Sequence, residues 1–113
     1  MSDCLFCKII AKEIPAKMVY EDARVLAFRD IDPKAPTHIL VIPRRHVEKL
    51  SDLKPDDTAL AGELVMTAVK IAALEGLGEG FRLVVNNGKS AGQHVFHIHF
   101  HLIGGKPLGW NPA

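Results

Sequence analysis

Apolar positions along the chain repeat with two different periods. Near the N-terminus they recur at helical spacing, at Leu5, Phe6, Ile9 and Ile10. This spacing predicts a helix of one or two turns that is capped by Asp3 and ends before Pro15. A longer helical pattern places apolar residues on one broad face, at Leu60, Leu64, Ala68, Ile71 and Leu74. It predicts the main helix over 58–75, with Gly76 as its stop.

Short β-prone runs account for much of the remaining chain. They predict five strands, over 18–21, 25–29, 38–42, 81–86 and 95–103. The elements show no regular strand–helix–strand alternation, which favours an α+β fold with an antiparallel sheet of about five strands, one long helix and a short N-terminal helix. We expect one domain over residues 1–113. A chain of this size exposes much of its surface, so we also expect a self-paired homodimer.

Composition and charge exclude several classes of protein. The 113 residues are 48% hydrophobic, and 14 Lys and Arg stand against 13 Asp and Glu, for a net charge of +1. This balance argues against nucleic acid or an anionic membrane as a partner. The longest mainly apolar stretch, 58–74, contains Glu63 and Lys70 and falls short of the roughly 18 uncharged residues of a spanning helix. The N-terminus has no secretory pattern, so we expect a cytoplasmic protein.

Histidine is the unusual residue of this sequence. Six are present, and four of them fall within eight positions, at His94, His97, His99 and His101. On a strand, the last three would share one face about 6.5–7 Å apart. A polar exposed face, a metal site and a nucleophile with flanking partners are the alternatives. Three histidines of one strand seldom converge on a single ion, so catalysis is favoured. Because imidazole titrates at about pH 6.5, the central ring can be a neutral nucleophile while a neighbour holds the leaving group's proton. We expect a backbone carbonyl to hold the ring nitrogen that does not attack.

The run 97–103 carries a resemblance to a known family. It reads H-φ-H-φ-H-φ-φ, where φ is apolar, and this is the signature of the histidine triad superfamily. Further blocks that resemble its nucleotide-binding branch lie at 6–10, 13–15, 27–31, 35–43, 84–86, 92–93 and 104–105. The uridylyltransferase branch has proline between its last two triad histidines, where this chain has Phe100. The dinucleoside polyphosphate hydrolase branch usually lacks the double glycine and the tail with Trp110.

The resemblance implies a fold, an assembly and an activity. The fold would be the histidine triad fold, with the sheets of two subunits joined across a homodimer. The activity would be hydrolysis of the P–N bond of purine nucleoside 5′-phosphoramidates, and of aminoacyl adenylates, releasing a nucleoside monophosphate. The reaction would pass through a covalent nucleotidyl-histidine and need no metal for its chemistry.

By the same resemblance, the catalytic residues are His99, His101, His97 and His38. His99 would attack the α-phosphorus. His101 would stabilise the phosphate oxygens together with the amides of Gly92 and Gln93. His38 would hydrogen-bond within the triad and tune its protonation; its ordinary alternative is a cap at a strand start.

Further nucleotide-binding residues follow from the resemblance. Asp30 would accept both ribose hydroxyls, and its alternative is a turn residue. Phe6 and Ile31 would form the apolar walls around the purine, although core residues would look the same. Asn86 would lie near the phosphate and sugar, or simply end a strand. His94 stands where many relatives have a serine near the leaving group, so it either supplies a proton there or points away.

A second group of residues indicates a metal. Cys4 and Cys7 form a C-x-x-C, which in a reducing compartment indicates half a metal site or a redox pair before a disulfide. Some prokaryotic relatives bind zinc with such a pair, a histidine at the position of His46, and the first triad histidine, here His97. Two thiolates and two imidazoles suit tetrahedral Zn²⁺, which would have a structural role. The alternative is two buried, apolar thiols.

Two functions of other classes compete with the hydrolase. The first is a nucleotide-binding regulatory module with weak or no catalysis, against which the intact His99 argues. The second is a zinc-dependent structural or redox protein that uses Cys4 and Cys7. Hydrolysis of dinucleoside polyphosphates is the alternative within the enzyme class.

Overall fold

The structure, a computed structural model, describes residues 3–111; residues 1–2 and 112–113 of the predicted domain lie outside this range. In chain order, the helices and strands in this range are α1 (Leu5–Ile10), β1 (Met18–Glu21), β2 (Val25–Arg29), β3 (Thr37–Pro43), α2 (Thr58–Leu74), β4 (Phe81–Val85) and β5 (Phe100–Gly104). Short 3-10 turns at Leu50–Asp52, Pro55–Asp57 and Lys89–Ala91 lie between them.

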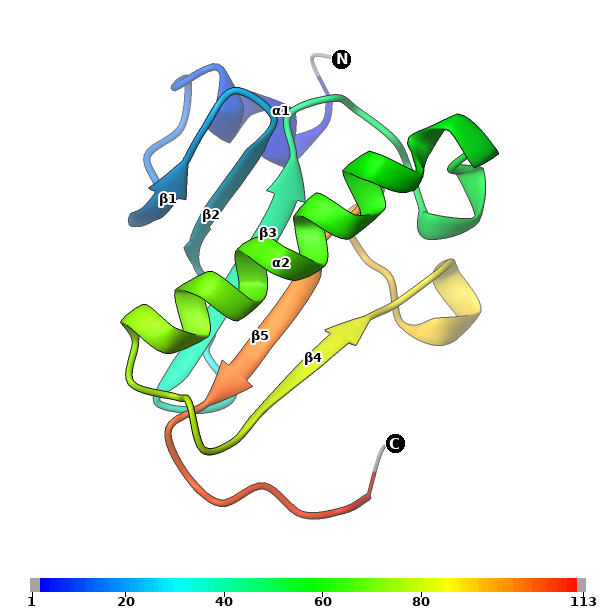
Figure 1. Ribbon diagram of the computed structural model, residues 1–113. Helices are drawn as coiled ribbons and strands as arrows, with labels where there is room; N and C mark the ends of the chain where they lie inside the picture. Colours follow the sequence, from blue (N-terminus) through cyan, green and yellow to red (C-terminus); the bar gives the residue numbers. More distant parts are fainter. Residues whose placement is uncertain (1–2, 112–113) are drawn as a thin grey trace.

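The strands form one antiparallel sheet in the order β1-β2-β3-β5-β4. α2 crosses one face of this sheet, while α1 lies near its other side (Figure 1). This confirms the α+β fold with an antiparallel sheet, one long helix and a short N-terminal helix. The predicted strands 18–21 and 25–29 have the predicted bounds, and α2 ends one residue before the predicted helix.

The centre of the sheet is buried on both faces. The core beneath α2 includes Val25, Ala27, Ile39, Val41, Leu64 and Ile71. The core beneath α1 consists of Phe6, Ile9, Leu26, Phe28, Leu40 and Ile42. Successive residues of β2 and β3 thus enter opposite cores, which explains why both strands are continuous apolar runs. The α1 side of the sheet is the side on which the histidines gather.

The last strand begins later than the pattern predicts. The prediction is 95–103, whereas β5 starts at Phe100 and pairs with β3 only as far as Val41. Farther along β3 comes Pro43, which has no N–H to donate to another strand. The Pro43 carbonyl instead accepts a hydrogen bond from the His97 ring at 2.7 Å. Residues 95–99 therefore lie outside the strand, and His101 is the triad histidine within it.

The two helices differ in length and in how they begin. α1 has six residues, and its cap is Cys4 rather than the predicted Asp3, because the Cys4 sulfur accepts the Cys7 N–H at 3.3 Å. α2 has 17 residues and follows the turn that starts at Pro55. Among residues 3–111, neither helix has the length and apolar character needed to cross a membrane.

Candidate active site

The three triad histidines keep the predicted alternation although two of them precede β5. Ile98, Phe100 and Leu102 enter the α2 core. The His97 and His99 rings instead lie against Phe6 of α1, with ring centroids 6.0 and 5.1 Å away. The His101 ring follows at 5.0 Å from that of His99. The prediction that the three rings share one side is therefore correct.

Hydrogen bonds fix the tautomer of His99. Its Nδ1 lies 2.8 Å from the backbone carbonyl oxygen of His97. A carbonyl oxygen can only accept, so Nδ1 carries the hydrogen and Nε2 keeps a free lone pair. The His99 side chain is 8% exposed and lines a cavity. It has the form that a nitrogen nucleophile requires.

A second chain of hydrogen bonds fixes His38 and His101. The backbone N–H of Lys34 donates to His38 Nδ1 at 3.0 Å, which places the hydrogen of His38 on Nε2. His38 Nε2 then donates to His101 Nδ1 at 2.9 Å, and Asp30 Oδ2 lies 3.4 Å from the same Nε2. His101 consequently carries its hydrogen on Nε2. The predicted contact of His38 with the triad is present.

Burial keeps these rings neutral. Burial, together with the neighbouring His99 and His38 rings, lowers the pKa of His101 to about 4. Burial also lowers the pKa of His99 and that of His38, while the Asp30 carboxylate acts in the opposite direction on both. At neutral pH His99 is therefore unprotonated. His101 is a neutral ring too, and it carries one hydrogen, on Nε2.

An apolar cavity of about 320 Å³ lies between α1 and the sheet. Phe6, Ile9, Phe28 and Leu40 are among its apolar walls, and Asp30, His99 and His101 bring polar groups to it. Phe6 is 4% exposed and packs edge-on against the Phe28 ring. Ile31 lines the cavity too but is 99% exposed, which places it at the rim. Mainly apolar walls with a few polar groups are typical of small-molecule sites.

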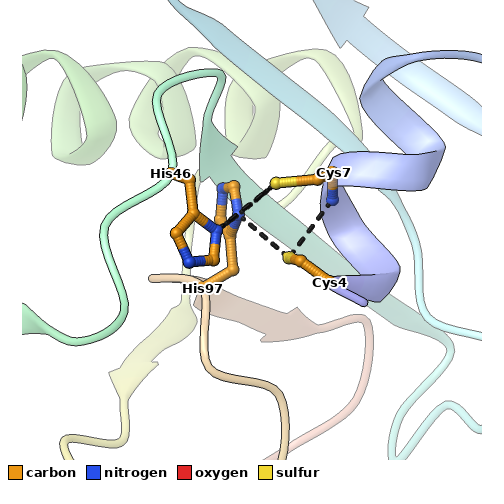
Figure 2. Close-up of side chains that lie close together, drawn as sticks. All are labelled: Cys4, Cys7, His46 and His97. Atoms are coloured by element: carbon orange, nitrogen blue, oxygen red, sulfur yellow. Dashed lines mark hydrogen bonds between the residues drawn. The ribbon is translucent and has the colours of Figure 1, made fainter. Parts of the chain in front are cut away.

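The residues predicted to hold a metal also come together. Cys4 and Cys7 from the start of α1, His46 from the segment after β3, and His97 place one ligand atom each within 4.8 Å of all the others (Figure 2). The His97 Nδ1 atom is 3.4 Å from Cys4 Sγ, 3.6 Å from Cys7 Sγ and 3.2 Å from His46 Nδ1. Cys7 Sγ is 3.3 Å from His46 Nδ1.

These distances fit a tetrahedral metal ion. Zinc bonds of about 2.0–2.3 Å place neighbouring ligand atoms about 3.3–3.8 Å apart. His97 Nε2 donates to the Pro43 carbonyl, so the Nδ1 lone pair of His97 faces the cluster. Burial lowers the pKa of His97 to about 4, which keeps it in the neutral, metal-binding form. The two sulfur atoms and His46 Nδ1 all lie around the Nδ1 lone pair of His97. A cation at the centre would accept an electron pair from each of the four residues. The cluster could therefore hold a metal ion.

Comparison with known proteins identifies the family. Residues 11–108 match the HIT domain, the histidine triad family. The chain belongs to the HIT family. It is 51% identical to an uncharacterized HIT-like protein of Synechocystis, over 98% of this chain and 97% of the other.

Solved HIT structures have the same fold. A HIT family hydrolase from Legionella pneumophila is 50% identical, with a TM-score of 0.96 over 98% of this chain and 100% of that one. A HIT family hydrolase from Clostridium thermocellum is 40% identical, with a TM-score of 0.97 over 100% and 99% of the two chains. The resemblance to the superfamily is thus confirmed, and these relatives are named as hydrolases.

Other predicted site residues of this HIT protein lie away from the cavity walls. The Gly92 and Gln93 amides donate to the carbonyls of Lys89 and Gly88 at 3.0 and 3.1 Å, so they are not free for a phosphate. The Gln93 side chain is 2% exposed and hydrogen-bonds Gly88, Glu48 and Val95. Asn86 Nδ2 donates to the Ala91 carbonyl at 2.8 Å. The pair 92–93 and Asn86 therefore brace the loop 86–93.

His94 lines a different depression. It is exposed and shares a hollow of about 570 Å³ with Cys4, His46 and Glu48. It is not among the residues that line the cavity beside His99. The structure thus favours the alternative in which this imidazole points away from His99.

The sequence interpretation expected a backbone carbonyl to hold the central triad ring, which the His97 carbonyl does, but it missed the other backbone groups that orient the site. The Pro43 carbonyl orients His97, the His97 carbonyl orients His99, and the Lys34 N–H orients His38. Residue type carries no signal for such groups, because any residue offers them. It also missed Ile9 and Leu40 as cavity walls, which are indistinguishable from core residues in a sequence.

Proposed function

We propose that this HIT protein hydrolyses the P–N bond of purine nucleoside 5′-phosphoramidates, and the related acyl–phosphate bond of aminoacyl adenylates. The observation that carries the proposal is the state of His99. Its Nδ1–H is held by the His97 carbonyl, its Nε2 is free, and the ring borders a cavity of about 320 Å³. A neutral, oriented imidazole beside an apolar cavity suits attack on the phosphorus of a bound nucleotide.

The proposed reaction has two displacements. His99 Nε2 forms a bond to the α-phosphorus while the P–N bond breaks, and the amine leaves with a proton taken from water. The positive charge that develops on the imidazole is stabilised by the His97 carbonyl at Nδ1. Water then attacks the phosphorus and the bond to Nε2 breaks, which releases the nucleoside monophosphate and the neutral ring. The proton lost by the attacking water neutralises the hydroxide that remained after the amine left. His101 Nε2–H donates to a phosphate oxygen in both steps.

The cavity offers groups for the rest of the nucleotide. The purine would lie between the apolar walls that include Phe6, with Ile31 at the rim. Asp30 would accept the ribose hydroxyls; its Oδ1 already accepts the Asp32 N–H at 2.8 Å, which orients the carboxylate. A carboxylate has about four acceptor positions, so capacity remains for the sugar.

We further propose that the cluster of Cys4, Cys7, His46 and His97 holds Zn²⁺. A bound zinc ion would fasten α1 to the segment after β3, and the catalytic steps make no use of it.

A homodimer is proposed for the same molecule. α2 and the edge strand β4 expose apolar side chains, at Val65, Met66, Val69, Leu74 and Phe81. A sheet edge with unpaired backbone groups beside such side chains is suited to pairing with a second copy.

The test is release of AMP from adenosine 5′-phosphoramidate by the wild-type protein and by His99→Ala. We expect turnover in the wild type and a loss of about four orders of magnitude or more in the variant, with AMP binding retained. Substantial turnover by the variant would contradict the assignment of the nucleophile. AMP binding without turnover in the wild type would instead favour a regulatory binding module.

A further inference from the structure

α1 is too short to be stable by itself. It has six residues, whereas isolated helices of fewer than about 12–15 residues are marginal in water. Its N-cap acceptor is the Cys4 sulfur, a weak acceptor, and its first turn has no acidic residue. The position of α1 therefore depends on what its side chains contact.

Two kinds of contact alternate along this helix. Cys7 and the cap residue Cys4 point into the metal cluster (Figure 2). Between them in sequence, Phe6 packs edge-on against the His99 ring, with centroids 5.1 Å apart. Phe6 and Ile9 also line the cavity. Metal ligands and cavity wall thus belong to the same short helix, so one cannot move without the other.

His97 makes a second connection between the two sites. Its Nδ1 faces the cluster, and its backbone carbonyl holds the Nδ1–H of His99 at 2.8 Å. Its Nε2 is fixed by the Pro43 carbonyl. A displacement of the His97 ring would shift the group that orients the nucleophile.

We infer that metal in the cluster and nucleotide in the cavity bind cooperatively, with α1 as the coupling element. An ion bound to Cys4, Cys7, His46 and His97 would fix α1 and, with it, the Phe6 side chain in the cavity wall. Binding of the nucleotide would then no longer include the entropy cost of ordering that wall. Linkage requires that the nucleotide increase metal affinity by the same factor. Couplings between two sites are typically about 5–150-fold, and we expect about tenfold here. The inference rests on the proposed nucleotide cavity and zinc site.

The experiment measures both directions of the linkage in the whole protein. Calorimetric titration with AMP compares the zinc-loaded protein with protein stripped by a chelator, whose fold is checked by far-ultraviolet circular dichroism. We expect the AMP dissociation constant to rise about tenfold on zinc removal. Competition with a chelating dye then measures zinc affinity with and without saturating AMP, and we expect a matching tenfold gain.

Two variants of α1 identify the coupling element. Phe6→Leu keeps all four ligands and the His97 connection but loses the edge-on contact with His99, so the coupling factor should fall well below the wild-type value while zinc still binds. Lys8→Ala changes the same helix at a residue that lines neither site, so it should keep the wild-type factor. Should the stripped protein unfold, the zinc-loaded proteins decide: AMP must slow zinc transfer to the dye in wild type and Lys8→Ala, and clearly less in Phe6→Leu.

The outcomes separate this inference from the proposed function. Equal AMP affinity with and without zinc, failure to bind zinc, or full coupling in Phe6→Leu overturns the inference and leaves nucleotide hydrolysis intact. Failure of both forms to bind AMP overturns the nucleotide cavity and the coupling with it.

Discussion

Two pairs of histidines flank His99, the proposed nucleophile, and they differ in the chemistry that they can perform. The rings of His46 and His97 have centroids 5.1 Å apart, and those of His38 and His101 are 5.2 Å apart. In the first pair both Nδ1 atoms face each other at 3.2 Å beside two sulfur atoms. In the second, Nε2–H of one ring donates to Nδ1 of the other at 2.9 Å. The first pair, with its two lone pairs directed at each other, is suited to binding a cation. The second pair is already joined by a hydrogen bond.

Backbone groups determine the tautomers, and so the difference between the two pairs. A carbonyl, that of Pro43, takes the Nε2–H of His97 and leaves a lone pair toward the cluster. An N–H, that of Lys34, occupies Nδ1 of His38 and leaves an N–H toward His101. In both pairs, the hydrogen-bond partner of one ring nitrogen decides whether the other nitrogen of that imidazole offers a lone pair or a hydrogen.

Disrupting the first pair should give the largest change in stability. His46→Ala removes one of the four proposed ligands, so the protein should lose its zinc and the thermal midpoint should fall by about 15–20 °C, as expected for losing a ligand present at about 1,000 times its dissociation constant. Metal analysis and a thermal melt measure this. His94→Ala, beside the same hollow, is the matched control and should retain both zinc and midpoint. Unchanged zinc content in His46→Ala would remove His46 from the site.

Disrupting the second pair should reduce catalysis and leave the metal in place. In His38→Ala, His101 Nδ1 loses its donor, and the His101 hydrogen is no longer confined to Nε2. We expect kcat to fall about 10–100-fold, a typical loss for one positioned hydrogen-bonding group, with KM changed little. Steady-state kinetics and zinc analysis on the same preparation test this. Loss of zinc in His38→Ala would mean that the two pairs are not independent.

Acidification should produce a smaller effect and sharpen the comparison. Burial depresses the pKa of His101 from 6.5 to about 4 in the folded protein. The unfolded chain therefore binds more protons between these values, so stability is full above about pH 6.5 and declines as the pH falls toward 4. We expect a loss of about 1–2 kcal/mol by pH 5, measured by denaturant unfolding. His101→Gln should weaken this dependence, and an unaltered pH profile would contradict the assignment.

Much of the fold was predictable because it depends on side-chain periodicity. The continuous apolar run in 25–29 and the helical repeat in 58–74 both indicate burial, and burial is what the structure shows there. The gathering of Cys4, Cys7, His46 and His97 was predictable from the C-x-x-C together with the resemblance to the family. The start of β5 was not, because it depends on Pro43 in a neighbouring strand. The Gly92 and Gln93 amides were assigned to a phosphate, but a loop's internal hydrogen bonds have no signature in residue type.

Burial on both sides of β3 constrains how this protein can change over evolution. All seven residues of the strand are buried, and its side chains alternate between two cores of different purpose. A single residue inserted before Leu40 would reverse the face of the sheet on which the following side chains lie. Leu40 and Ile42 would then lie beneath α2, and the cavity would lose Leu40 from its wall. Length variation in this family is therefore expected in the connecting loops. β3 should tolerate substitutions that preserve side-chain volume, but not the insertion or deletion of a single residue.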